Sequence, residues 1–271
     1  MVFQGLSADR FCRPAWLLAL AVLVGCAQAP KDPTAGWSAD KLYAEARDEV
    51  GNNAYDKAIV LFEKLEGRAA GTPLAQQAQL EKAHAHYRNG EPAQAVATLD
   101  RFMRLHPASP ALDYALYLKG LVNFNDNLGL LGRLGGRDLS ENDQKAAKDS
   151  HAAFQDLVTR FPDSKYTPDA KLRMGFIVNS LAQSEVNVAR YYLQRGAYVA
   201  AVNRAQTAIE EFKNAPALEE ALFILYRAYD AMGLVQLRDD TLRVLKLNYP
   251  HSQFVGASGT PELKRPWYRL W

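Results

Sequence analysis

The segment FQDLVTRFPDSKYTPDA, residues Phe154 to Ala170, contains a helix end, a turn and a helix start. Its first apolar residues recur at the spacing of one buried helix face, at Phe154, Leu157, Val158 and Phe161. Pro162 ends this helix, and Pro168 is tolerated just inside the next helix because its missing N–H would have no intrahelical partner there. The segment therefore predicts the join between two helices, the first of which needs a neighbour to cover its apolar face.

The same join recurs along the chain. The segments RLHPASPALDYA at 104–115 and LNYPHSQF at 247–254 repeat the corner in which a hydrophobic residue stands one or two before a proline. Residues 52–65 also align with residues 89–102, at an offset of 37. A unit of about 34 residues with a small residue early in its second helix and a closing proline is the tetratricopeptide pattern. We therefore expect an all-α fold of about five tetratricopeptide-type helical hairpins in a right-handed superhelix.

The apolar periodicity and the positions of proline and glycine predict two helices for each hairpin. The expected helices are residues 39–50, 55–66, 74–88, 92–105, 111–125, a helix around Phe154, 168–195, 198–212, 217–232 and 236–248.

Composition and charge favour a globular chain and argue against one class of partner. The 271 residues are 48% hydrophobic and 23% charged, which supplies enough apolar surface to bury a core. The formal net charge is +2, and without the first 25 residues 30 basic side chains stand against 29 acidic ones. A nearly neutral chain without a basic stripe argues against nucleic acid as a partner.

The N-terminus has the layout of an export signal. Arg10 and Arg13 precede an apolar run, 15–24, that is too short to span a bilayer but suits the h-region of a secretory signal. The run ends LVGC, and small residues before a cysteine at this point resemble the bacterial lipobox. In a lipobox the cysteine, here Cys26, carries N-acyl and S-diacylglycerol lipid and becomes the first mature residue. The alternative is an ordinary signal peptide that happens to contain a cysteine.

The lipobox predicts where the mature chain begins and where it resides. Residues 1–25 would be the signal peptide, and residues 26–37, which lack helical periodicity, would be a tether from Cys26. Ala27 stands where an aspartate would favour the inner membrane in two-membrane bacteria, so we expect a lipid anchor in the outer membrane, facing the periplasm. Cys12 would be removed with the signal, which leaves no internal disulfide.

Enzyme signatures are not found in the sequence. His84 and His86 would lie about 200° apart on a helix and could not share a metal as an i, i+4 pair would. The glycines of residues 127–144 resemble a phosphate loop, but no G-x-x-x-x-G-K-[ST] motif is present and no strand leads into them, which favours a flexible insertion. No G-x-S-x-G elbow occurs. We expect no enzyme activity, no cofactor and no metal site.

The remaining candidate site is a binding groove. In a tetratricopeptide superhelix the first helix of each hairpin lines the concave face. The slots of these helices that point into the groove are occupied by Tyr43, Arg47, His84, Tyr87, Arg88, Tyr114, Tyr117, Phe124 and Asn125. Their aromatic rings would contribute apolar area to an extended peptide, and their guanidinium groups would hold its carboxylates. The alternative for each ring is that it packs between neighbouring hairpins.

The chain also ends on aromatic residues. Residues 253–271 lack helical periodicity and finish WYRLW at 267–271. This tail either docks on a partner or is a frayed terminus.

Three segments go beyond a generic repeat. They are DYALYLKGLVNFNDNLG at 113–129, RFPDSKYTPDAKLRM at 160–174 and VARYYLQRGAYVAAVNRA at 188–205. Together with the lipobox they resemble the BamD family, the lipoproteins of the machine that folds β-barrels into the bacterial outer membrane. The resemblance covers roughly residues 42–252, with the glycine-rich insertion in its place. The tryptophan-rich tail departs from it, so nothing about the tail carries over.

The resemblance implies a non-enzymatic scaffold with two binding regions. The C-terminal repeats, 145–252, would dock on a periplasmic POTRA domain of the barrel protein BamA, beside other lipoproteins of the machine. The N-terminal repeats, 38–126, would receive the aromatic-ended targeting segments of unfolded barrel proteins. Tyr198, Asn203 and Arg204 carry over as BamA contacts, although a charge at Arg204 is also what an exposed helix carries.

Two other classes of function stay open on the sequence alone. One is a peptidoglycan-associated hydrolase or enzyme accessory with helical repeats, which predicts a buried carboxylate pair or a metal cluster. The other is a generic periplasmic tetratricopeptide adaptor for a cell-wall enzyme, which predicts no affinity for BamA.

Overall fold

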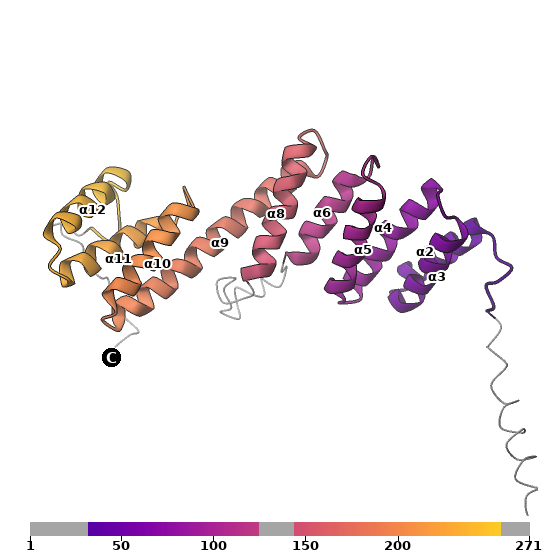
Figure 1. The fold of residues 1–271 in the computed structure, drawn as a ribbon, viewed down its shortest axis with the longest axis horizontal. Coiled ribbons are helices and arrows are strands. Elements are labelled where there is room, and N and C mark those ends of the chain that lie inside the picture. Colours follow the sequence, from indigo (N-terminus) through magenta and orange to yellow (C-terminus); the bar gives the residue numbers. More distant parts are fainter. Residues whose placement is uncertain (1–31, 125–143, 256–271) are drawn as a thin grey trace, which may run out of the picture.

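A computed structural model of the chain describes residues 32–124 and 144–255, and the regular elements in these ranges are ten α-helices (Figure 1). In chain order they are α2 (Ala39–Gly51), α3 (Tyr55–Arg68), α4 (Pro73–Arg88), α5 (Pro92–Leu105), α6 (Leu112–Asn123), α8 (Gln144–Arg160), α9 (Thr167–Gln194), α10 (Tyr198–Glu211), α11 (Leu218–Ala231) and α12 (Val235–Asn248). The expected all-α class is confirmed, and the helix ends lie within two residues of those predicted, except that α8 begins ten residues before Phe154.

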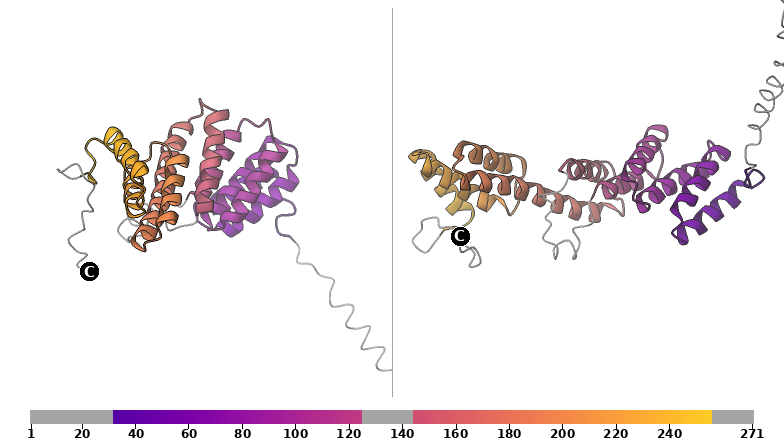
Figure 2. Two further views of the ribbon diagram at one scale, coloured as in Figure 1. Left: turned by 60° about the vertical axis from the view of Figure 1, so that its left-hand side comes forward. Right: turned by 90° about the horizontal axis from the view of Figure 1, so that it is seen from below.

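The helices form five consecutive hairpins, α2–α3, α4–α5, α6–α8, α9–α10 and α11–α12, which follow one another in a single elongated row (Figure 1, Figure 2). Each hairpin packs its first helix on the second helix of the preceding hairpin. The join is loosest between α5 and α6, in the middle of the row. Stacking of this kind gives every hairpin only its neighbours as partners, as expected of a repeat protein.

Local sequence explains the turns between these helices. Thr72 caps α4 by accepting a hydrogen bond from the Ala75 amide at 3.3 Å, and Pro73 follows at the first helical position. Pro168 lies in the first turn of α9, as predicted. Gly196, between α9 and α10, has a φ of +74°, a left-handed conformation that glycine adopts without strain.

The core lies between the hairpins, where small residues alternate with large ones. Ala58, Phe62 and Leu65 of α3 are fully buried, as are their counterparts in α5, Ala95, Leu99 and Phe102. In the third hairpin Phe154 and Leu157 are fully buried, whereas Val158 and Phe161 are only partly covered. The stripe predicted from the sequence therefore forms, with its second half at the edge of the core.

Several predictions fall on residues outside the described ranges. They are the signal peptide at 1–25, the lipid site Cys26, the tether up to residue 31, the insertion from 127 to 143 and the tail beyond residue 255. The expected insertion ended at Gln144, which is instead the first residue of α8.

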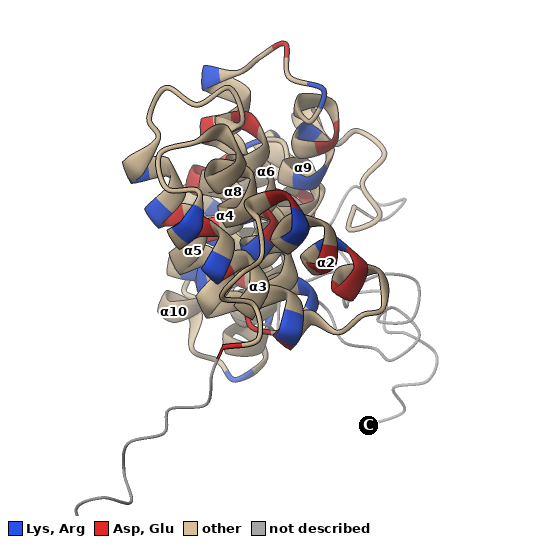
Figure 3. Cartoon of the chain, turned by 90° about the vertical axis from the view of Figure 1, so that its right-hand side faces the viewer, with Lys and Arg blue, Asp and Glu red and all other residues tan. Residues whose placement is uncertain are grey.

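Two properties of the described residues bear on function, namely the apolarity of the helices and the distribution of charge. Within residues 32–124 and 144–255 no helix has both the length and the apolarity needed to cross a membrane. Basic and acidic residues are interspersed over α2 to α5 at the N-terminal end of the row (Figure 3), where ion pairs such as Arg47 with Glu81 and Lys64 with Asp32 join them.

Candidate binding surface on the first helices

Polar contacts link the first helices of the first two hairpins, and aromatic and polar contacts link those of the third and fourth; we call the surface that these four helices form the first-helix strip. It begins between α2 and α4, where the Gln77 side chain donates a hydrogen bond to the Tyr43 hydroxyl at 2.5 Å. One turn further along both helices, Arg47 pairs with Glu81 at 2.7 Å. Tyr43 and Gln77, like Arg47 and Glu81, are 34 residues apart, so equivalent positions of adjacent repeats touch.

The middle of the strip is aromatic. On α6, Tyr114 lies 5.6 Å from Tyr166, which precedes α9, and Tyr117 stacks on the same ring at 4.7 Å between centroids. The Tyr117 hydroxyl donates a hydrogen bond to Asp169 of α9 at 2.8 Å. These rings pack between neighbouring hairpins, as the second interpretation of the aromatic residues anticipated, and they also line the strip.

The far end of the strip is apolar and exposed. Phe124 lies 5.9 Å from Phe176 of α9, ring centroid to ring centroid, and the Arg173 guanidinium lies 4.9 Å above the Phe124 ring. Phe176 keeps 45% of its surface exposed, and Leu172, one turn before it, keeps 75%. Both therefore offer apolar area that the folded chain does not use.

The electrostatics of the strip favour paired groups over reactive ones. Burial raises the pKa of Tyr114 to about 12, and the nearby Glu81 carboxylate adds to this. Burial lowers the pKa of His84, so its imidazole is neutral near pH 7. Burial acts to raise the pKa of Asp169, but hydrogen bonds from Arg173 and Tyr117 outweigh it and lower that pKa. Among the described residues of the strip, the shifted groups are held by burial and by partners within the fold.

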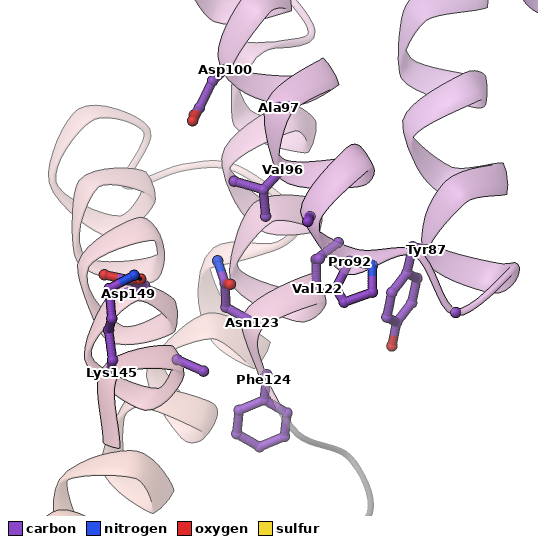
Figure 4. A pocket seen from close by; sticks show the side chains of 13 residues that line it. Tyr87, Pro92, Val96, Ala97, Asp100, Val122, Asn123, Phe124, Lys145 and Asp149 are labelled. Carbon is purple, nitrogen blue, oxygen red and sulfur yellow. Dashed lines mark ion pairs between the residues drawn. The ribbon is translucent and has the colours of Figure 1, made fainter. Parts of the chain in front are cut away.

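Two predicted groove residues lie beside the strip. The Arg88 guanidinium lies 5.5 Å from the ring of Tyr55 on α3. Tyr87 lines a cleft of about 820 Å³ between α5, α6 and α8, at whose lower end Phe124 also lies (Figure 4). At about 100° per residue, Tyr87 points about 60° from His84 and about 100° from Arg88. Asn125 lies outside the described residues.

The predicted partner contacts lie on a different part of the row. Arg204 of α10 is 48% exposed and pairs with Glu185 of α9 at 3.1 Å, and Asn203 beside it is exposed. Tyr198 is partly buried against the core. The three residues thus share one helix, and Asn203 and Arg204 form its accessible part.

The described residues give no sign of a metal centre. No group of three or more histidine, cysteine, aspartate and glutamate side chains comes together within them. His86 pairs with Glu91 at 2.6 Å, while His84 belongs to the strip, so the two histidines have different partners.

Sequence reasoning missed three residues of the strip on α9, namely Leu172, Arg173 and Phe176. The signal for one of them was present. Leu172 stands four residues after Pro168, as the predicted groove residue Tyr114 stands four residues after Pro110.

Comparison with known proteins identifies relatives over most of the chain. A family model described as YfiO, outer membrane lipoprotein, matches residues 36–254. A protein of Neisseria meningitidis serogroup A, named outer membrane protein assembly factor BamD, is 47% identical over 238 residues, which are 88% of this chain and 89% of the relative. A protein of the same name from Vibrio cholerae is 32% identical, over 86% of this chain and 96% of the relative.

Solved structures show weaker similarity. A tetratricopeptide repeat protein from Parabacteroides merdae aligns with 80% of this chain and 68% of its own at 13% identity and a TM-score of 0.38. The MamA protein aligns with 79% of this chain and 95% of its own at 16% identity and a TM-score of 0.37.

Proposed function

Since this chain belongs to the YfiO family of outer membrane lipoproteins, the BamD family of the sequence analysis, we propose that it is a non-enzymatic scaffold for the assembly of outer membrane β-barrel proteins. In this role it holds unfolded barrel proteins on the first-helix strip and docks on a POTRA domain of BamA through its C-terminal repeats. The relatives reported above are named outer membrane protein assembly factors, and these names support a role in that process.

The observation that carries the substrate role is the apolar end of the strip. Phe176 is exposed beside Phe124, Leu172 is exposed one turn before Phe176 on α9, and the guanidinium of Arg173 lies over the Phe124 ring. An aromatic side chain at the end of a substrate chain would bury area against these groups, while its carboxylate would interact with the Arg173 guanidinium, which also pairs with Asp169 at 2.6 Å. The stacked tyrosines extend the contact toward the N-terminal hairpins.

The partner contact is proposed on α10. Arg204 and Asn203 are exposed on α10 of the fourth hairpin, and Arg204 pairs with Glu185, nine residues beyond Phe176 on α9. BamA would then be held without covering the substrate surface. The lipid at Cys26 would keep the chain at the periplasmic face of the outer membrane, and the family description supports that location.

The substrate role is tested by measuring the affinity of the full chain for a synthetic peptide that ends in the aromatic C-terminal segment of a barrel protein. Leu172→Asp and Phe176→Ala are expected to raise Kd by about tenfold or more, because an apolar side chain buried in a complex contributes more than one factor of ten. These exposed positions make few contacts within the fold, whereas Tyr117→Ala would also remove the stack on Tyr166.

Leu105→Asp is the matched control, since Leu105 is also exposed but lies at the end of α5, outside the strip. Unchanged affinity in both α9 variants would rule out the apolar end as the substrate site. Loss of affinity in Leu105→Asp as well would mean that an exposed aspartate weakens binding wherever it stands.

A further inference from the structure

The two ends of the row differ in the surface that they present. At the N-terminal end, α2 exposes none of its large apolar side chains. At the C-terminal end, α12 and the turn before it expose five, Leu234, Val235, Leu237, Val244 and Leu247. Terminal repeats of such proteins normally carry a polar outer face, because no further repeat covers them. The apolar end of this row therefore needs a cover.

Three of these five residues form one stripe beside the buried face of α12. Leu237, Val244 and Leu247 are 47%, 40% and 80% exposed, and at 100° per residue they fall within about 80° of one another. Thr241 and Leu245 are buried on the neighbouring face, against α11. Among the described helices α11 is the only substantial neighbour of α12, so the stripe faces outward, where a further helix pair would stand in a longer array.

The chain itself continues from this end unit. Phe254 stacks on Phe223 of α11 at 4.9 Å, and the Gln253 amide donates a hydrogen bond to Glu219 at 3.0 Å. Residues 256–271 thus start beside the last hairpin. At about 3.3 Å per residue they could reach about 50 Å, more than twice the roughly 21 Å length of a 14-residue helix such as α12.

The composition of residues 256–271 matches the stripe. Their apolar side chains are Leu263, Trp267, Tyr268, Leu270 and Trp271, and their basic ones are Lys264, Arg265 and Arg269. Asp240 lies on α12 between Val244 and Leu247 in direction and pairs with Arg243 at 2.6 Å, so a basic residue on the cover would meet a carboxylate that already has one partner. Attachment to the same chain gives such a segment a millimolar effective concentration, which a second copy or a separate protein would have to exceed.

We propose that residues 256–271 fold back on the Leu237, Val244 and Leu247 stripe of α12 and cap the C-terminal end of the row. The cap needs neither the substrate site nor the BamA contact of the proposed function. Its failure would leave both intact.

The test places a photoreactive phenylalanine at position 267 in the full chain, in cells, and identifies the crosslinked peptides by mass spectrometry after illumination. The expected product is an intrachain crosslink to α12. Leu237→Asp combined with Val244→Asp should lower its yield by about tenfold or more, because two buried aliphatic side chains contribute more than one factor of ten to docking. Leu105→Asp, exposed on α5, should leave the yield unchanged.

Three results would overturn the cap. A crosslinked dimer would show that a second copy covers the stripe, and a crosslink to another protein would assign the tail to a partner. An intrachain crosslink that survives both α12 substitutions would place the tail elsewhere. If the doubly substituted chain fails to accumulate, the single variant Leu247→Asp, at the most exposed position, replaces it with the same expectation.

Discussion

At the scale of single residues, the tightest constraint joins α6 to α8. Gly120 of α6 faces the buried ring of Phe154, the residue that opens the segment from which the repeat was read. A Cβ at position 120 would lie 2.6 Å from the Cζ of that ring, closer than real contacts allow. A fully buried ring has little room to move, so glycine is required for the close approach of the two helices.

Gly120→Ala is therefore expected to destabilise the protein by about 2 kcal/mol, the usual cost of overpacking a core. Thermal unfolding followed by circular dichroism measures the loss. Gly175→Ala is the control, because Gly175 is also inside a helix but a Cβ there meets nothing within 4 Å. It is expected to stabilise the chain by about 0.5 to 1 kcal/mol. A Gly120→Ala chain as stable as the parent would show that the helices can separate at no cost.

A second residue-scale prediction concerns His84 and pH. Burial lowers its pKa, Arg88 and Arg47 act in the same direction, and Glu81 opposes them. The unfolded chain, with an ordinary histidine pKa of about 6.5, then binds a proton more readily than the folded one. Stability should fall as the pH drops through about 6.5, and His84→Gln should make that decline shallower.

Urea unfolding midpoints between about pH 7.5 and pH 5 measure the effect. His151, whose pKa burial also lowers, accounts for part of the remaining slope. His251→Gln, which removes an exposed imidazole, should change the slope less. An identical slope in the His84→Gln chain would mean that protonation of this ring is not linked to folding.

At the scale of helices, a buried ion pair fixes the join between the first two hairpins. Lys82 of α4 pairs with Glu66 of α3 at 2.7 Å, and both side chains are only 9% exposed. Arg101 of α5 approaches the same carboxylate at 3.9 Å. A buried charge is tolerated only with its partner, so the pair specifies which faces of α3 and α4 meet.

Lys82→Met is expected to cost about 3 kcal/mol, because it leaves the Glu66 carboxylate buried beside a distant cation. Adding Glu66→Gln should recover most of that loss, since the pair itself contributes little net stability. The double-mutant cycle is measured by urea unfolding. Equal losses in the single and the double variant would show that the cost comes from packing around Lys82 and not from the unpaired charge.

The limits of the sequence as a guide are clearest at this scale. Helix ends were predicted within two residues where Pro73, Pro92 and Pro168 or a turn glycine marks them, because these residues act through local geometry. Contacts one repeat apart, such as Tyr43 with Gln77, follow from the repeat and were within reach. The contact of Gly120 with Phe154 was not, since residues 125–143 interrupt that hairpin and break the offset.

The predicted groove residues also divide into those that helical spacing placed correctly and those whose position depends on packing. The helical spacing predicted that Tyr114 and Tyr117 share one surface, because spacing fixes the direction in which each side chain points. Tyr87 and Arg88, at the end of α4, lie beside that surface, and their distance from the next hairpin depends on tertiary packing. Exposure of Leu172 and Phe176 also depends on what the neighbouring hairpins leave uncovered, which spacing alone does not give.

At the scale of the whole molecule, the row separates three surfaces. The strip crosses the first helices of four hairpins, Arg204 lies on the second helix of the fourth, and the apolar stripe lies on the last helix. Arg204 pairs with Glu185 of α9, which lies nine residues beyond Phe176 on that helix, so about 14 Å of helix rise separates the two surfaces. The effects of exposed substitutions on distant surfaces should therefore add.

Arg204→Glu tests this independence together with the proposed partner contact. The change reverses an exposed charge and sets a second carboxylate beside Glu185. The amount of BamA recovered with the chain from detergent extracts is expected to fall by about tenfold or more, because loss of one interfacial charge pair commonly has an effect of this size. Peptide affinity on the strip should stay within about twofold, and Leu172→Asp should show the opposite pattern. Lys57→Glu, an exposed charge reversal on α3, is the matched control for both measurements. Retention of BamA by the Arg204→Glu chain would rule out α10 as the docking site. Loss of both BamA recovery and peptide affinity in that one variant would show that the two surfaces are coupled through the row.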